Sequence, residues 1–258
     1  MRARILGVAQ DGGVPHLGCD CSRCAAARED PSLVRYPASL LLDTGERRVL
    51  VDTTPDIRQQ VERVDAVVLT HAHYGHLPGL LAFGKECVDA DALPVHCTPE
   101  LATLLRDNEP FARLVAADNL DLRPFDGGVA FDGLTIEPVR VPHRDELGTG
   151  TRAFRIAGER RLFYAPDLDC WTSETVREVD RADTALVDGT FFSDDELPRQ
   201  AEVPHPRIEE SLTRLPAGDV RFVHCNHTNP VLDSRSPERA AVEDAGFHVA
   251  ERGTELPL

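Results

Sequence analysis

Short apolar runs, separated by turn residues, recur along the whole chain and predict many short strands interleaved with helices. In the first half these runs follow one another closely through Gly- and Asp-containing turns, whereas in the second half they alternate with helical segments. The predicted strands are 2–9, 38–43, 48–52, 64–70, 93–97, several segments between 120 and 141, 152–156, 161–164, 184–187 and 220–224. Two mixed sheets packed face to face with helices outside satisfy both halves. We therefore expect an α/β sandwich that forms one domain over 1–258.

Helix-start residues place the helices between these strands. Thr98 is suited to cap a helix that begins at Pro99, because proline is favoured at the first helical position. The predicted helices are 24–29, 99–106, 172–179, 208–215 and 237–245, with His205 at the opening of the fourth.

Charge and composition argue against a nucleic-acid-binding protein and against a membrane protein. The chain has 28 basic and 44 acidic residues, which gives a formal charge of −16. Binding to nucleic acid through a basic face needs clustered Lys and Arg, and a membrane-spanning helix needs about 20 consecutive apolar residues. Neither feature is found, and the N-terminus lacks the pattern of a signal peptide. We expect a cytoplasmic protein that binds neither nucleic acid nor membrane.

The chain contains a single lysine, Lys85, and all its other basic residues are arginines. An acidic surface with almost no lysine indicates a halophilic protein, whose self-repulsion is screened by molar salt. A genome rich in G and C, which favours arginine codons, explains the same composition.

Three cysteines lie close together in a C-x-C-x-x-C pattern at Cys19, Cys21 and Cys24. Their spacing does not allow independent disulfides, and a cytosolic chain keeps its thiols reduced. Three thiolates facing one ion predict a structural zinc site in a loop of about 16–30. Tetrahedral zinc requires a fourth ligand from elsewhere in the chain.

Three histidines, His71, His73 and His76, follow the apolar strand 66–69 in an H-x-H-x-x-H pattern. Neutral imidazoles with this spacing at a strand end are typical of metal ligands. Further candidate ligands also come directly after strand-like segments: Asp52, His143, Asp167 and His224. Polar residues at the ends of neighbouring strands line one rim of a sheet, so we expect a shared site.

At these residues the chain resembles the metallo-β-lactamase superfamily, whose H-x-H-x-D-H motif is matched by His71, His73 and His76 and is followed downstream by a His, an Asp and a His. The resemblance implies an αββα sandwich with metals at the sheet edge. It also implies that His71, His73 and His143 hold one divalent metal (Zn²⁺, Mn²⁺ or Fe²⁺). His76 and His224 would hold a second metal, with Asp167 shared between the two.

Two groups within the superfamily are similar to particular segments. The loop 9–15, the cysteine triplet, 187–192 and 227–233 resemble the pyrroloquinoline-quinone biosynthesis B group. The triplet and the segment 224–227 resemble the cyclic phosphodiesterase of phosphonate degradation. The second resemblance implies that His227 is the fourth ligand of the structural zinc. Phosphodiesterase and tRNA-processing relatives imply that His205 donates a proton, with Asp188 orienting it.

One residue departs from the motif, because Gly75 stands where the superfamily has its aspartate. Glycine offers no ligand atom. Either the second metal is then weakly bound or the site is mononuclear.

These features predict a metal-dependent hydrolase that uses a metal-activated water on a small anionic substrate, a linear or cyclic phosphodiester. Asp167 would orient the water, His205 would act as general acid with Asp188 as its partner, and Asp52 would fix the tautomer of a ligand histidine. An iron-dependent oxygenase or cofactor-maturation protein is one alternative. A second alternative is a non-catalytic binding module whose fold is stabilised by bound metal. A homodimer is the default assembly, since closed twofold dimers are the commonest.

Overall fold

Two seven-stranded sheets form the centre of this computed structural model, which describes all residues 1–258. The first sheet has the order β14-β1-β2-β3-β4-β5-β6, and the second has the order β13-β12-β11-β10-β9-β8-β7. The strands are β1 (Arg2–Gly7), β2 (Ser39–Asp43), β3 (Arg48–Val51), β4 (Ala66–Val68), β5 (Leu93–Cys97), β6 (Leu120–Pro124), β7 (Val129–Phe131), β8 (Leu134–Arg140), β9 (Arg152–Ala157), β10 (Arg161–Ala165), β11 (Thr184–Asp188), β12 (Asp219–Val223), β13 (His248–Val249) and β14 (Glu255–Pro257). Each sheet contains both antiparallel and parallel pairs, so the predicted sandwich of two mixed sheets is confirmed.

Alternation along the strands builds the core between the sheets. In β2, Leu40 and Leu42 belong to the buried cluster that joins the two sheets, whereas Leu41 joins the cluster on the outer face. In β10, Tyr164 faces inward and Phe163 faces outward in the same way. Because successive side chains of a strand point to opposite faces, strands buried on both sides are apolar throughout.

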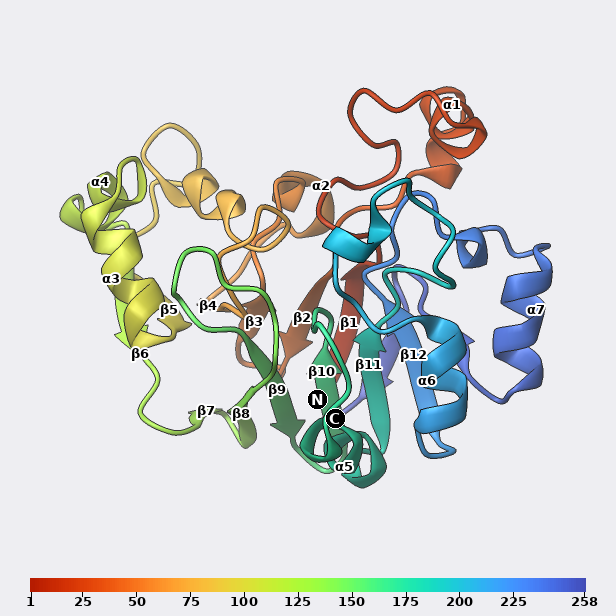
Figure 1. Cartoon of the computed structure of the whole chain (residues 1–258). Helices are drawn as coiled ribbons and strands as arrows, with labels where there is room; N and C mark the ends of the chain where they lie inside the picture. Colours follow the sequence, from red (N-terminus) through yellow and green to blue (C-terminus); the bar gives the residue numbers. More distant parts are fainter.

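Helices cover the two outer faces of the sandwich (Figure 1). The first sheet is covered by α2 (Ile57–Gln60), α3 (Pro99–Asp107) and α4 (Phe111–Ala116), and the second by α5 (Ser173–Arg181), α6 (Ile208–Arg214) and α7 (Pro237–Asp244). The remaining helix α1 (Ser22–Glu29) and four 3₁₀ turns lie in the connections: η1 (Pro31–Leu33), η2 (Pro78–Phe83), η3 (Gln200–Glu202) and η4 (Pro230–Leu232). None of these helices combines the length and the apolar character that crossing a membrane requires.

The boundaries of several elements differ from the predicted ones. The predicted strand 64–70 is only Ala66–Val68, because the backbone N–H of Thr70 donates to the Asp52 side chain, at 2.8 Å, instead of a neighbouring strand. His205 does not open a helix, since α6 begins at Ile208. The residue before a proline is disfavoured in the helical region, and Pro206 follows His205 directly.

Parallel pairing brings the carboxyl ends of many strands to one edge of the sandwich. Strands β3, β4, β5 and β6 run parallel in the first sheet, as do β10, β11, β12 and β13 in the second. Segments that follow these strands therefore meet at a common rim, where an open α/β sheet usually binds its ligands.

Candidate metal centre

Side chains at the rim converge from both sheets. From the first sheet, Asp52 follows β3 directly, and His71 lies three residues beyond the end of β4. From the second, Asp167 follows β10, and His224 comes directly after β12. The side chains of all four are buried, so the two sheets enclose these polar groups between them.

One group of possible metal ligands combines His71, His73, His143 and Asp167, whose ligand atoms all lie within 4.8 Å of one another. His143 Nε2 is 3.1 Å from His73 Nδ1, and Asp167 Oδ2 is 3.3 Å from His71 Nε2 and 3.2 Å from His143 Nε2. Three imidazoles and a carboxylate are a donor set suited to Zn, Mn or Fe. These are the residues that the resemblance assigns to the first metal.

A second group combines His76, His224 and a residue that the sequence did not identify, Asp11. Asp11 Oδ1 lies 3.5 Å from the Nε2 atoms of both His76 and His224. Asp167 Oδ2 is 3.6 Å from His224 Nε2 and 4.0 Å from His76 Nε2. Asp167 therefore lies between the two groups and can serve both.

The second ring nitrogen of four of these histidines is held by another side chain. The pairs are His76 Nδ1 with Asp52 Oδ2 at 2.8 Å, His143 Nδ1 with Asp169 Oδ1 at 2.9 Å, His224 Nδ1 with Thr190 Oγ1 at 2.9 Å and His71 Nδ1 with Thr70 Oγ1 at 2.9 Å. Partners of this kind fix the tautomer and orientation of metal-binding histidines. Asp52 has the expected geometry, whereas Asp169 was not predicted.

Unpaired buried atoms show that the cluster is suited to a cation. Eight buried side-chain nitrogen or oxygen atoms in the chain lack a hydrogen-bond partner, and six of them belong to this cluster: Asp11 Oδ1, His71 Nε2, His76 Nε2, Asp167 Oδ1, His205 Nε2 and His224 Nε2. Leaving buried polar atoms unsatisfied costs about 1–3 kcal/mol each. Atoms that converge on one space without partners are explained by a ligand that they share, and the residues fit a divalent metal.

The protonation of the cluster follows from its burial and its charges. Burial lowers the pKa of His71 and of His73, which keeps these rings neutral at pH 7. Burial acts in the same direction on His76, but the charges of Asp52 and Asp11 outweigh it and raise its pKa. For Asp167, burial favours the neutral acid, yet His224 and His143 overcome this effect and hold its pKa well below the usual range.

His205 and Asp188 lie beside the two groups. Asp188 Oδ2 is 2.8 Å from His205 Nδ1 and also accepts a hydrogen bond from the backbone N–H of Leu168 at 3.1 Å. The other ring nitrogen, His205 Nε2, is buried and has no partner. Burial alone would lower the pKa of His205, but Asp188 and Asp167 raise it above its ordinary value.

The cysteine cluster forms a separate group with His227. Their ligand atoms lie within 4.8 Å of one another, and the Nδ1 atom of His227 is 3.6, 3.9 and 3.7 Å from the sulfur atoms of Cys19, Cys21 and Cys24. Backbone N–H groups also point to the sulfurs, as from His16 to Cys24 Sγ at 3.3 Å. Three sulfurs and one imidazole are the donor set of a closed zinc site.

Two arginines near the predicted site are paired with acidic residues, and a neighbouring tyrosine is exposed. Arg144 faces Glu146, which also contacts His73 Nε2 at 3.0 Å. Arg207 pairs with Asp194 at 2.7 Å and stacks over the ring of Phe191. Tyr74 is 62% exposed.

The αββα sandwich and the paired ligand groups at its rim define a protein of the metallo-β-lactamase type. The model of the β-lactamase superfamily domain matches residues 47–240, and the chain belongs to this superfamily.

Within it, the chain is similar to the coenzyme PQQ synthesis protein B of Pseudomonas paraeruginosa, with 31% identity over 313 aligned positions that cover 100% of both chains. The corresponding protein of Cupriavidus necator is also 31% identical and covers 99% of each chain. The crystal structure of zinc-bound PqqB from Methylobacterium extorquens is 30% identical, covers 100% of both chains and has a TM-score of 0.87. A diphosphatase of the PhnP family shares the fold with a TM-score of 0.75 at 23% identity, covering 100% of this chain and 97% of the other.

Proposed function

We propose that this protein is a metal-dependent hydrolase of small phosphodiesters. The observation that carries the proposal is the arrangement of two histidine groups around one shared carboxylate, Asp167, whose Oδ1 lies 3.5 Å from Nδ1 of His205. Enzymes that cleave phosphate esters use such a pair of metal positions to hold the attacking and the leaving oxygen.

The imidazoles would hold a divalent metal, which would lower the pKa of a bound water to about 7 and polarise a phosphoryl oxygen. Asp167 is positioned to accept a hydrogen bond from that water and to orient it, because its carboxylate faces both groups. The hydrogen-bonded carboxylates of Asp52 and Asp169 hold His76 and His143 in place, so the site is ordered before substrate binds.

His205 is the group placed to protonate the leaving oxygen. Its Nδ1 is hydrogen-bonded to Asp188, which leaves the proton to be donated on Nε2, the atom without a partner. A histidine held by a carboxylate and facing the reaction space is the usual arrangement of a general acid. Asp188 acts on the reaction through His205.

The charge of the chain favours a small substrate. A formal charge of −16 repels a long polyanion, whereas the metals attract a single phosphate group at short range. A linear or cyclic phosphodiester of low molecular mass satisfies both conditions.

The same proposal assigns a structural zinc to the three cysteines and His227, because their donor set is closed and complete.

The test is hydrolysis by protein reloaded with Zn²⁺ or Mn²⁺. We expect turnover of bis-p-nitrophenyl phosphate and of cyclic nucleotides, and its loss in His71→Ala. His248→Ala is the matched control, since His248 is an exposed histidine on β13 outside the site. Turnover that survives in His71→Ala would contradict the metal mechanism. The absence of turnover with both metals would contradict the proposal that the substrate is a small phosphodiester.

The alternative is an oxidative cofactor-maturation enzyme, favoured by 31% identity to the PQQ synthesis protein B over the full chain. That alignment runs over 313 positions for a chain of 258 residues, so the relative has segments that this chain lacks. Iron-loaded protein that consumes oxygen with a quinone precursor would support the alternative. Hydrolysis at the same rate under anaerobic conditions would count against it.

A further inference from the structure

The side chain of Asp11 lies in the space that a side chain at position 75 would need. A Cβ atom added to Gly75 would lie 2.3 Å from Asp11 Oδ1 and 2.8 Å from Asp11 Cα. Real Cβ atoms do not approach other atoms so closely. The side chain of Asp11 therefore fills the volume into which any side chain at 75 would project.

The loop after β1 is tied to the segment that carries His224. Gln10 donates its backbone N–H to the carbonyl of Cys225 at 2.9 Å, and Cys225 donates to the carbonyl of Val8 at 2.9 Å. This pairing places Asp11 beside His224 and opposite His76. Its Oδ1 is enclosed and has no hydrogen-bond partner.

We propose that Asp11 is the metal ligand that replaces the missing motif aspartate, so that the second metal position is complete in spite of Gly75. The inference rests on the metal site of the proposed function but not on the reaction catalysed there. The carboxylate reaches the same place from the N-terminal loop instead of from the H-x-H-x-x-H segment. Glycine at 75 is then required, because a larger residue would displace Asp11.

Substitution of either residue tests the proposal by metal content. Metal per chain is measured after dialysis against Zn²⁺ buffer, with the cysteine site as the internal reference. We expect Asp11→Ala and Asp11→Asn to lose one equivalent, or to bind it at least about tenfold more weakly. Gly75→Ala should lose the same equivalent, because its Cβ would meet both Oδ1 and Cα of Asp11.

The readout separates this proposal from the hydrolase function, since metal content does not depend on turnover. Full stoichiometry and affinity in both single Asp11 variants would overturn the proposal. Full stoichiometry and affinity in a folded Gly75→Ala variant would overturn the requirement for glycine at position 75. Near-UV circular dichroism and retention of the cysteine-site zinc report folding.

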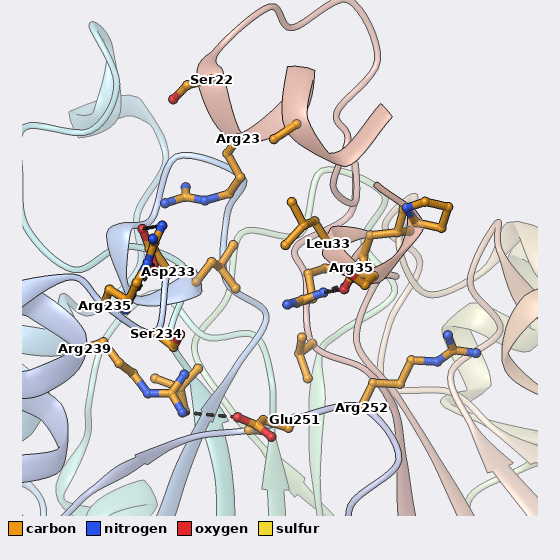
Figure 2. A pocket seen from close by; sticks show the side chains of 18 residues that line it. Ser22, Arg23, Leu33, Arg35, Asp233, Ser234, Arg235, Arg239, Glu251 and Arg252 are labelled. Atoms are coloured by element: carbon orange, nitrogen blue, oxygen red, sulfur yellow. Dashed lines mark hydrogen bonds and ion pairs between the residues drawn. The ribbon is translucent and has the colours of Figure 1, made fainter. Parts of the chain in front are cut away.

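A second, independent feature is a cavity of about 860 Å³ lined by other residues than the histidine rim. It lies between α1, η1, the segment before α7 and the residues after β13, and none of the metal-site residues line it. Figure 2 shows Arg23, Arg35, Arg235, Arg239 and Arg252 around this space. In a chain of net charge −16, five arginines against two acids in one cavity is an unusual concentration of positive charge.

Three of these arginines have no carboxylate partner. Arg23 donates to the carbonyl of His227, Arg35 donates to the carbonyls of Ser32 and Val34, and Arg252 stacks on the ring of Tyr36. The two acids of the cavity are already paired, Asp233 with Arg235 at 3.2 Å and Glu251 with Arg239 at 3.4 Å. Burial lowers the pKa of Arg35, and the neighbouring charge of Arg23 lowers it further against the opposing effect of Glu251.

The geometry points to a binding site for a small multivalent anion, one that carries two or more carboxylate or phosphate groups. Guanidinium groups recognise both of these by paired N–H donors. A volume of about 860 Å³ is within the range of pockets that enclose whole small molecules.

Benzene-1,3,5-tricarboxylate and methylene diphosphonate are the probes, and benzoate is the monovalent comparison. Calorimetric titration of the metal-loaded protein at low salt should show binding of one of the two multivalent probes, and the one that binds identifies the preferred group. Arg35→Gln and the exposed Arg252→Gln should each weaken binding about tenfold. Arg160→Gln removes the same charge from an exposed position outside the cavity and should leave binding unchanged.

Binding that is equal in all three variants would show adventitious attraction to the metals or the surface and would overturn the site. Binding of neither multivalent probe would overturn it too. Benzoate that binds as tightly as the tricarboxylate would refute the multivalent ligand.

Discussion

Asp188 Oδ2 lies 2.8 Å from Nδ1 of His205, and the opposite nitrogen of the same ring is buried without a partner. The carboxylate is itself held by the backbone N–H groups of Leu168 and Thr190 at 3.1 and 2.8 Å. The imidazole is therefore held in one orientation beside the metal ligands, since its Nδ1 is also 3.5 Å from Asp167 Oδ1.

Replacing His205 by Ala should lower the rate by about 10²–10⁴-fold for phosphodiesters with alkyl leaving groups, because these need a proton to depart. The loss should be much smaller for p-nitrophenyl esters, whose leaving group is stable as an anion. The comparison of kcat for the two substrate types measures the effect. Metal content is the control, and equal losses for both substrate types would contradict the role of His205.

Asp188→Asn should show the same dependence on the leaving group, with a smaller loss, since it acts by orienting His205. A purely structural role would lower the rate for both leaving groups alike. Steady-state kinetics on the same two substrates distinguish these outcomes.

Asp52→Asn should weaken metal binding about 10–100-fold in the group of His76, because Asp52 holds the Nδ1 of that ring. Asp52 has a φ of 65°, a left-handed conformation that asparagine also tolerates, so the backbone is not disturbed. Titration with a chelator measures the affinity. Asp65→Asn is the matched control, since Asp65 accepts a backbone hydrogen bond from Arg48 away from the site. Equal affinities of the two variants would refute the role of Asp52.

Asp169→Asn should weaken metal binding in the other group, because Asp169 Oδ1 is 2.9 Å from Nδ1 of His143. The expected loss is about 10–100-fold in affinity for the metal held by His71, His73 and His143. The double variant with Asp52→Asn should lose affinity at both positions, which two-step chelator titration resolves. A loss confined to the group of His76 would contradict the assignment.

The seven cysteines should react with a thiol reagent in three steps. Cys87 and Cys170 are exposed and should react at once in the metal-loaded protein, whereas the three thiolates that face His227 should react only after zinc is chelated. Cys97 and Cys225 are buried, which raises the pKa of Cys97 to about 12, and they should react only on unfolding. Five fast thiols in zinc-loaded protein would contradict a closed zinc site.

Much of the architecture could be predicted because its signals are local. The apolar run within 38–43 and the proline after Thr98 are readable over a few residues. The histidines at the end of β4 are also local, since their spacing alone presents several rings on one short segment. Two of the segments whose extent differs from the prediction are 64–70 and the one around His205. In the first, the N–H of Thr70 donates to Asp52, and in the second, α6 begins only at Ile208, after Pro206.

Asp11, Asp169 and the arginine cavity could be found only in the tertiary structure. Gly75 indicated that one metal ligand of the motif is missing. The residues near it do not indicate that Asp11, 64 positions earlier, fills the space. That depends on how the loop after β1 packs against Cys225, a contact between residues more than two hundred positions apart. Sequence spacing determines which side chains one segment can present together, whereas the packing of distant segments decides which of them share a ligand.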